Sequence, residues 1–360
     1  MPKSFTEDEV GDRIEAMRRR RPRFIDDRIT MAHGAGGKAS RQLVEGLIVP
    51  LLANPALEAL GDAALLTVNG TRLAFTTDAF VVRPIRFPGG SIGELAVNGT
   101  INDLAVSGAR PVALSAGLIL EEGVGTDVVR AEMEAMGAAS VQAGVPVVAG
   151  DTKVVERGHC DSMYIVTTGV GVVEPEVSLA PTRVQPGDKV LVSGTIGDHG
   201  VAILLARGDL EIEADVRSDT TPLWSLASTL LAACGDSLHC MRDATRGGVA
   251  TVLNEIALAA EVGVVIAEDR VPMRPEVIGA GEILGIDPLY MANEGKLVAF
   301  VAPERADAAL EAMRANPAGA AAAIIGEVRS EPPGRVLGRT TFGGHRMIDV
   351  LVGDPLPRIC

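Results

Sequence analysis

The sequence predicts a mixed α/β protein of two domains followed by a mobile tail. Its 360 residues are enough for two cores of ordinary size. Strand and helix patterns alternate, but several strands follow one another directly, which favours an α+β arrangement over uninterrupted βαβ winding. With 47% hydrophobic and only 3% aromatic residues, the cores must consist of Ala, Val, Leu and Ile. We expect an extension over residues 1–28, domains over 29–175 and 183–350, and a tail over 351–360.

The first half of the chain begins with a charge-dense segment that contains the basic run Arg18-Arg19-Arg20-Arg21. We interpret it as a short helix with a solvated face rather than as a nucleic-acid-binding arm. Hydrophobic periodicity then predicts helices over residues 40–52, 91–108 and 127–143 and strands over 73–77, 111–120, 145–149 and 164–173. A stretch rich in Pro, Glu, Thr and Gln over residues 174–188 marks the domain boundary.

The second half repeats this alternation. Strands are predicted over residues 189–194, 262–267, 297–301, 322–328, 334–339 and 346–350, and helices from residue 201 and over 223–233, 249–260 and 303–315. Residues 209–221 are acidic and are expected to form a loop. The last ten residues contain Pro355 and Pro357, which bar a helix, and end at Cys360. We expect this tail to be extended and solvated, with an accessible thiol that can enter and leave a pocket.

Charge and cysteine content exclude several classes of protein. The formal net charge of −14 and the sequence pI of about 4.9 argue against nucleic acid or an anionic membrane as a partner. No apolar run approaches the length of a membrane span, and the first residues lack the apolar region of a signal peptide. Cys160, Cys234 and Cys240 form no C-x-x-C pair and read as reduced residues of a cytoplasmic protein.

Two kinds of motif indicate a site for a phosphorylated ligand. The segment His33-Gly34-Ala35-Gly36-Gly37-Lys38 combines glycines, whose backbone N–H groups can approach an anion, with a lysine. Gly247 and Gly248 open a helix N-terminus, which also favours an anion. Aspartates stand beside glycine or small residues at the ends of predicted elements. Clustered carboxylates require cations, and an all-oxygen ligand set favours Mg²⁺ with a polyphosphate. The five candidates, each of which taken alone is more simply read as a turn or helix-cap residue, are Asp62, Asp78, Asp103, Asp151 and Asp243.

Taken in order, these motifs resemble a known family. Gly61-Asp62-Ala63-Ala64, Thr76-Thr77-Asp78, the run from Asn102 to Pro111, Gly150-Asp151-Thr152-Lys153 and the run from Asp243 to Gly248 are similar to the ATP-binding superfamily of aminoimidazole ribonucleotide synthetase and selenophosphate synthetase. Within it, His33 to Lys38, Asn293-Glu294-Gly295 and the terminal Pro357-Arg358-Ile359-Cys360 resemble the HypE family of hydrogenase maturation factors. The resemblance covers residues 30 to 360.

The resemblance implies a homodimer in which the N-terminal sheets pair, with ATP and Mg²⁺ in a cleft. The metal would be held by the five aspartates, and the nucleotide also by Lys38, Asn102, Gly247 and Gly248. The carbamoyltransferase HypF would load a carbamoyl group on Cys360. ATP would then drive dehydration of the S-carboxamide to an S-cyanide, and the cyanide would pass to iron on a HypC–HypD complex during assembly of a [NiFe]-hydrogenase centre.

Specific roles can be assigned to three side chains in this chemistry. Cys360 carries the carbamoyl group, Glu294 is the candidate base that takes the N–H proton, and Lys153 either orients the thiocarbamate oxygen or relays the second proton. The plainer interpretations are a turn residue for Glu294 and a surface lysine for Lys153. The five histidines show no metal-ligand spacing, and four of them, His33, His199, His239 and His345, are read as structural.

Two other functions fit parts of the sequence. One is another ATP-dependent synthetase of the same superfamily, of the selenophosphate type. That activity would call for a reactive cysteine in the glycine-rich N-terminal loop, which has none. The other is a non-catalytic ATP-binding scaffold whose terminal thiol tethers a partner. ATP turnover by the carbamoylated protein separates the enzyme from the scaffold.

Overall fold

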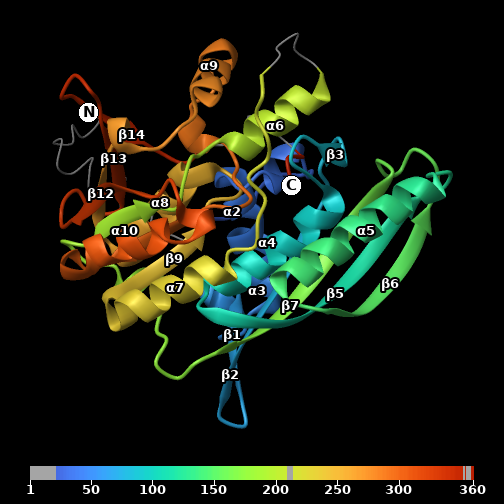
Figure 1. The fold of residues 1–360 in the computed structure, drawn as a ribbon, viewed down its shortest axis with the longest axis horizontal. Helices are drawn as coiled ribbons and strands as arrows, with labels where there is room; N and C mark the ends of the chain where they lie inside the picture. The colour runs from blue at the N-terminus through green and yellow to red at the C-terminus, as the bar shows by residue number, and fades with distance from the viewer. Residues whose placement is uncertain (1–21, 209–213, 352, 354–357) are drawn as a thin grey trace, which may run out of the picture.

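Two β-sheets, each with helices packed against it, make up the molecule (Figure 1). The computed structural model describes residues 22–208, 214–351, 353 and 358–360. Strands between residues 64 and 173 form a five-stranded sheet, and strands between residues 189 and 348 form a seven-stranded sheet. This is the mixed α/β architecture that the alternating and adjacent strand patterns predicted.

The N-terminal sheet has the strand order β1-β2-β7-β5-β6. All neighbours are antiparallel except β5 and β6, which are joined by a helical crossover. The strands are β1 (Ala64–Val68), β2 (Thr71–Phe80), β5 (Ala109–Glu121), β6 (Val147–Val155) and β7 (Met163–Val173), and a small hairpin is formed by β3 (Arg86–Phe87) and β4 (Gly90–Ser91). The helices α4 (Ile92–Val106) and α5 (Thr126–Ala143) lie along one face of this sheet (Figure 1).

The other face of the N-terminal sheet carries exposed apolar side chains. The edge strand β6 is exposed over almost its whole length. Large apolar side chains at least two-fifths exposed lie on this face of β1 and β2, namely Leu66, Val68 and Phe75. Apolar side chains exposed together on one face of a sheet mark a candidate contact surface.

The C-terminal sheet has the order β14-β13-β10-β12-β8-β11-β9. Its central strands are buried on both faces, because α8 covers one side while α7 and α10 cover the other. The strands are β8 (Lys189–Val192), β9 (Leu238–Asp243), β10 (Gly263–Ala267), β11 (Leu297–Val301), β12 (Ala323–Arg329), β13 (Arg335–Arg339) and β14 (His345–Ile348). The helices are α6 (Asp198–Arg207), α7 (Trp224–Cys234), α8 (Gly248–Ala260), α9 (Pro275–Leu284) and α10 (Ala306–Arg314).

Short helical turns connect these elements. The predicted helix over residues 40–52 is one helical stretch made of α2 (Lys38–Leu43), a π-helical turn η2 (Val44–Ile48) and α3 (Val49–Leu52). The 3-10 turns are η1 (Met31–Gly34), η3 (Leu57–Ala59), η4 (Pro181–Arg183), η5 (Gly235–Ser237), η6 (Glu268–Arg270), η7 (Pro288–Tyr290), η8 (Pro303–Arg305) and η9 (Pro317–Gly319).

The first described residues of the chain are held against the 3-10 turn η1 by contacts to His33. Phe24 packs edge-on against the ring of His33 at 5.3 Å between centroids, and Asp26 Oδ2 lies 3.0 Å from His33 Nε2. The helix predicted around Arg18–Arg21 lies outside the described residues. Over the described parts of the chain, no helix is both long and apolar enough to span a bilayer.

Two predicted strands differ in extent from the structure, and some of its elements were not predicted. β2 continues to Phe80, so Asp78 lies within the strand rather than after it. β9 was not predicted because its sequence, Leu-His-Cys-Met-Arg-Asp, has neither a continuous apolar run nor a regular apolar alternation. β6 begins at Val147 and runs through Asp151 and Lys153, which therefore belong to the strand. The helix α9 was not predicted.

Candidate active site

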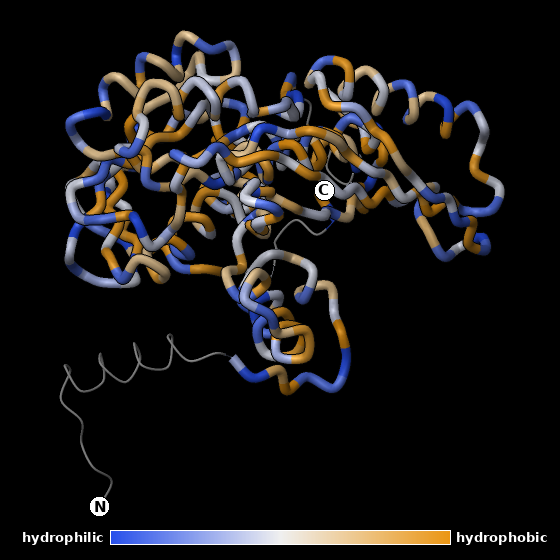
Figure 2. Tube along the Cα trace, turned by 90° about the horizontal axis from the view of Figure 1, so that it is seen from below, coloured by the Kyte–Doolittle hydropathy of each residue, from blue (hydrophilic) through white to orange (hydrophobic). Residues whose placement is uncertain are grey.

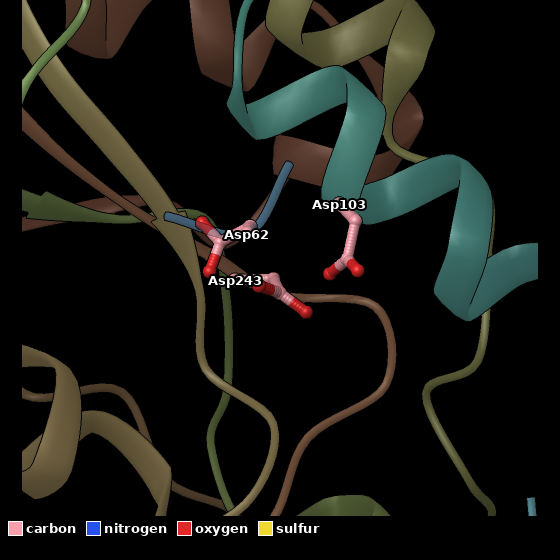
Figure 3. Close-up of side chains that lie close together, drawn as sticks. All are labelled: Asp62, Asp103 and Asp243. Carbon is pink, nitrogen blue, oxygen red and sulfur yellow. The ribbon is translucent and has the colours of Figure 1, made fainter. Parts of the chain in front are cut away.

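Four of the five aspartates singled out in the sequence line one cavity between the two domains. Asp62 precedes β1, Asp78 lies in β2, Asp103 lies in the last turn of α4, and Asp243 ends β9. Ligand oxygens of Asp62, Asp103 and Asp243 lie within 4.8 Å of one another. Figure 3 shows Asp103 extending from α4 toward the other two carboxylates. Elements that are far apart in the chain thus converge on one acidic cluster.

Neighbouring side chains hold the carboxylates in place. The Thr76 hydroxyl donates to Asp103 Oδ2 at 2.7 Å, and the Thr245 hydroxyl donates to Asp243 Oδ2 at 2.6 Å. The Arg242 guanidinium forms an ion pair with Asp62. Asp62, Asp103 and Asp243 are therefore each held by a neighbouring side chain.

The acidic cluster lacks enough positive charge for full ionisation. Burial raises the pKa of Asp103 well above its usual range, and the negative charges of Asp78, Asp243 and Asp62 raise it further. Burial and the charge of Asp62 raise the pKa of Asp243 to about 7. Burial also raises the pKa of Asp78, against the lowering effect of Arg246. Buried carboxylates in this state are stabilised by a bound cation.

The donor set fits a hard divalent cation. All the clustered ligand atoms are carboxylate oxygens, which Mg²⁺ and Ca²⁺ prefer and which zinc and copper sites rarely use alone. The cavity has a volume of about 320 Å³ and continues from the aspartates past Arg246 and Thr251 to Glu294 and Cys360. The same cavity thus joins a candidate metal site, an arginine and the two predicted reactive side chains.

Glu294 is buried at the wall of this cavity and is only 3% exposed. Its backbone N–H donates to Asp219 Oδ1 at 3.0 Å. Within the described part of the chain, Glu294 Oε1 is buried and has no hydrogen-bond partner. Burial raises the pKa of Glu294 well above its usual range, with further contributions from Asp219 and Asp243. A carboxylate with an unsatisfied oxygen and a raised pKa is suited to accept a proton.

The backbone around Glu294 is fixed by amides and by a close approach. Asn102 Nδ2 donates to the carbonyl of Glu294 at 3.0 Å, and Asn293 Oδ1 accepts from the Gly197 N–H at 2.8 Å. A Cβ on Gly295 would lie 1.9 Å from the carbonyl oxygen of Asp219, so only glycine fits. Asn102 is not on the cavity wall. The structure places this predicted nucleotide ligand behind Glu294, where both ends of its amide are in use.

The end of the chain lies inside the molecule, and the expectation of a solvated, accessible thiol is wrong for this structure. Figure 2 labels the C-terminus within the body of the fold. Ile359 is 2% and Cys360 is 7% exposed, and both pack in the core of the N-terminal domain. The backbone N–H of Val81 donates to the Cys360 carbonyl at 3.0 Å, as does that of Arg83 to the Arg358 carbonyl at 3.3 Å. The tail thus pairs with the chain that follows β2.

Three predicted side chains stay away from the cavity in a single chain. Asp151 and Lys153 form an ion pair at 2.6 Å on β6, with side chains 72% and 69% exposed. The predicted convergence of five aspartates therefore fails for Asp151. Lys38 Nζ lies 3.0 Å from Asp349 Oδ2 at the surface, so the predicted phosphate ligand is engaged elsewhere. From the glycine-rich loop, the structure brings Gly36 to the cavity wall.

Gly247 and Gly248 shape the turn before α8. Both have positive φ, and a Cβ on Gly247 would lie 2.1 Å from Thr251 Oγ1. A Cβ on Gly248 would lie 2.5 Å from the carbonyl oxygens of Leu289 and Met291. These glycines are required by the backbone. The cavity itself is lined by their neighbours Thr245 and Arg246 and by Thr251.

The sequence reasoning missed several residues of this site. Arg246 lies in the predicted run from Asp243 to Gly248, of which only Asp243 and the two glycines were predicted as site residues. Asp219 lies in a segment read as a loop, and its pairing with Lys296 depends on the fold. His199 was read as structural, although it lies in the glycine-flanked run Gly197-Asp198-His199-Gly200. A polar residue between glycines at a helix start is the signal that could have identified it.

Comparisons with known proteins identify the family of this chain. The models of the AIR synthase related protein, N-terminal and C-terminal domains, match residues 60–173 and 185–338. The chain is 52% identical over 337 residues to the carbamoyl dehydratase HypE of Rhodobacter capsulatus, covering 93% of this chain and 99% of that protein.

Two solved structures share the fold at high identity. A HypE structure in complex with ATP superimposes with a TM-score of 0.78 at 45% identity, covering 92% of this chain and 100% of that one. HypE in a HypE–HypF complex gives a TM-score of 0.82 at 42% identity, with 86% and 99% covered. The two domains, their order and almost the full length of the relatives are present here, and the chain belongs to the HypE family of AIR synthase-related proteins.

Proposed function

We propose that this protein is a carbamoyl dehydratase that uses ATP to convert an S-carboxamide on Cys360 into an S-cyanide for hydrogenase maturation. One observation carries the proposal: Cys360, Glu294 and the carboxylates of Asp62, Asp78, Asp103 and Asp243 line the same cavity. Relatives that cover the chain are named carbamoyl dehydratase HypE, and a related HypE was solved with ATP.

The reaction must remove one oxygen and two protons from the thiocarbamate. The group S–C(=O)–NH₂ becomes S–C≡N, and the oxygen leaves as phosphate once ATP has phosphorylated it. The products are the thiocyanate, ADP and phosphate. Mg²⁺ held by the four aspartates would neutralise the charge of the transferring phosphoryl group.

The residues of this chain supply position and a proton acceptor. The tail places Cys360 at the cavity wall, and a carboxamide on its sulfur would share that cavity with Glu294 and the acidic cluster. Glu294 Oε1, buried and without a partner among the described residues, takes a proton from the amide nitrogen. Arg246 lies in the same cavity and adds positive charge beside Cys360. The core around Ile359 excludes water, which would compete for the activated carbon.

The open face of the N-terminal sheet supports a homodimer. Its exposed apolar side chains, among them Leu66 and Phe75, would be covered by the same face of a second copy. Lys153 lies on the edge strand of that sheet and does not reach the cavity of its own chain. A catalytic role for Lys153, and any contribution of Asp151 to the metal site, therefore requires the paired subunit.

The remaining partners follow from the chemistry. The carbamoyl donor is a HypF-type carbamoyltransferase, since a related HypE was solved in complex with HypF. The cyanide acceptor is iron on a HypC–HypD complex. Cytoplasmic chemistry fits the four cysteines, which are all buried and reduced.

Intact mass spectrometry tests the proposal. The protein is incubated with ATP, Mg²⁺, carbamoyl phosphate and the carbamoyltransferase, and the mass on Cys360 is followed. The expected sequence is gain of a carboxamide and then loss of one water. ATP hydrolysis without any adduct on Cys360 would favour another synthetase, and binding of ATP without turnover would favour a scaffold.

A further inference from the structure

His199 occupies a buried position between the tail and the candidate base. It lies at the start of α6 and is fully buried. Its Nδ1 lies 2.8 Å from Ser218 Oγ, and its Nε2 lies 2.8 Å from the carbonyl oxygen of Ile359. Glu294 Oε1 lies 4.0 Å from the same Nε2. The ring is fixed edge-on against Phe87 at 5.5 Å. One imidazole nitrogen thus faces two acceptors.

The hydrogen bonds define which nitrogen carries the proton. A carbonyl oxygen only accepts, so Nε2 must carry a hydrogen toward Ile359. Ser218 Oγ accepts the backbone N–H of Thr220 at 3.2 Å, which leaves the hydroxyl proton for Nδ1. This pattern describes a neutral imidazole with its hydrogen on Nε2. Burial lowers the pKa of His199 and favours the same neutral form.

Among the described residues, the second acceptor, Glu294 Oε1, has no hydrogen-bond donor, and it is buried. If the tail withdraws, Nε2–H loses Ile359, and Glu294 Oε1 is the nearest acceptor that the structure records for it. A buried donor and a buried acceptor left unpaired side by side would cost more than the small ring movement that joins them.

We propose that His199 is a positioning residue that transfers its Nε2 hydrogen bond between Ile359, when the tail is docked, and Glu294, when the tail is withdrawn. This inference rests on the proposed function, in which Glu294 is the base. Docking of the tail frees Glu294 Oε1 at the moment when the group on Cys360 enters the cavity. Withdrawal ties the carboxylate to His199, so the base is held inactive while the sulfur is outside.

The first arm of the test measures how often the tail is withdrawn, through the rate at which iodoacetamide alkylates Cys360 in the full-length protein. Peptide mass spectrometry distinguishes alkylation of Cys360 from that of the other cysteines. His199→Phe keeps the ring contact with Phe87 but removes the bond to Ile359. We expect the alkylation rate of Cys360 to rise about tenfold, the scale of one buried hydrogen bond. His199→Gln, which can still donate, should stay within about twofold of wild type. His345→Phe, an exposed histidine in β14, is the matched control.

If His199→Phe does not fold, a second variant replaces it in the alkylation experiment. Ser218→Ala removes the hydroxyl that orients Nδ1 and should raise the alkylation rate about threefold. Thermal unfolding and ATP affinity show that each variant is native. Wild-type alkylation rates in the folded His199→Phe protein, or in Ser218→Ala if His199→Phe does not fold, would overturn the proposal.

The second arm measures the pKa of Glu294 by NMR titration of its carboxyl ¹³C chemical shift. The signal is assigned by its absence from the spectrum of Glu294→Gln. Ile359→Asp places a charge that the core cannot bury and withdraws the tail from a chain of unchanged length. The pKa of Glu294 should fall further in Ile359→Asp than in Ile359→Asp/His199→Phe, because the hydrogen bond that His199 donates to the Glu294 carboxylate after tail withdrawal is absent from the double variant. The charged groups around Glu294 are the same in both proteins, namely Asp219, Lys296, Asp243, Asp78 and Arg246.

Equal pKa values of Glu294 in the two tail-withdrawn proteins would overturn the exchange. Neither arm depends on turnover. If the wild-type protein forms no thiocyanate, the proposed function fails, whereas the labelling and titration results still decide the role of His199.

Discussion

Lys296 Nζ lies 3.0 Å from Asp219 Oδ2, and this ion pair is nearly completely buried behind Glu294. The positive charge of Lys296 keeps the pKa of Asp219 below its usual range despite burial. The ionised Asp219 then accepts the Glu294 N–H and helps to raise the pKa of the Glu294 side chain. A structural ion pair thus sets both the position and the proton affinity of the candidate base.

Breaking this pair should destabilise the fold strongly. Lys296→Met leaves the Asp219 carboxylate buried without its cation, and we expect a loss of about 3–5 kcal/mol in the free energy of unfolding. The double variant Lys296→Met/Asp219→Asn removes the unpaired charge and should recover part of that loss. Urea unfolding of the four proteins of this cycle measures the coupling. A double variant with the summed losses of the two single variants would contradict the pairing.

The acidic cluster should make stability depend on pH when divalent cations are absent. The pKa of Asp243 is raised to about 7 in the folded protein, above its value in the unfolded chain. Raised carboxyl pKa values mean that the folded state binds more protons, so this contribution to stability is present at low pH and is lost as pH rises toward and above 7. Asp243→Asn should therefore gain stability relative to wild type between pH 5 and 8.

Mg²⁺ should cancel that difference. A cation that binds the ionised carboxylates of the folded state stabilises wild type by mass action and cannot bind the Asn variant as well. Thermal unfolding of both proteins with EDTA or with Mg²⁺ at each pH makes the comparison. A pH-independent difference between wild type and Asp243→Asn would argue against coupled carboxylates. Equal shifts of both proteins on adding Mg²⁺ would argue against a metal site at Asp243.

The sequence could predict the elements and most of the acidic cluster because both depend on local patterns. Periodicity located α5 and β7 within one residue, and aspartates beside small residues at element ends led to Asp62, Asp103 and Asp243. Convergence itself was inferred from family resemblance. Local patterns could not show that Asp151 points away from the cavity, since that depends on β6 being the edge of the sheet.

Longer-range features of the site escaped sequence reasoning for the same physical reason. The tail was expected to be solvated because chain ends usually are, but Ile359 finds an apolar site and the tail backbone pairs with residues after β2. The roles of Asp219 and His199 depend on partners far away in the chain, Lys296 and Ile359. Contacts of this kind leave no periodic signal in one sequence.

The docked tail should contribute to stability. Deleting residues 358–360 exposes the site of Ile359, which is 2% exposed in the fold, and should cost about 1.5–3 kcal/mol. Cys360→Ser keeps Ile359 and should cost less than 1 kcal/mol. Both variants should lose the carbamoyl-derived adduct. Unchanged unfolding free energy after the deletion would mean that the tail is undocked in solution, and an adduct on Cys160, Cys234 or Cys240 would move the chemistry elsewhere.

Lys153 should act only in a dimer if it acts at all, because its side chain lies on the exposed edge strand β6. Cys360→Ser and Lys153→Ala homodimers should each fail to form thiocyanate. Mixed dimers of the two variants should recover about half the activity of wild type if Lys153 serves the other subunit's cavity. Light scattering establishes the dimer mass first. Inactive mixed dimers, or a monomeric wild type at micromolar concentration, would refute a role across the interface.

Glu294→Gln separates proton removal from phosphoryl transfer. The amide preserves size and the backbone bond to Asp219, so the variant should fold, bind ATP and accept the carbamoyl group on Cys360. It cannot take the proton, and dehydration should slow on the order of 10²–10⁴-fold, as for a missing general base. The retained carboxamide is heavier than the cyanide by one water, so intact mass resolves the stalled species. Conversion by Glu294→Gln at the wild-type rate would remove this residue from the role of base.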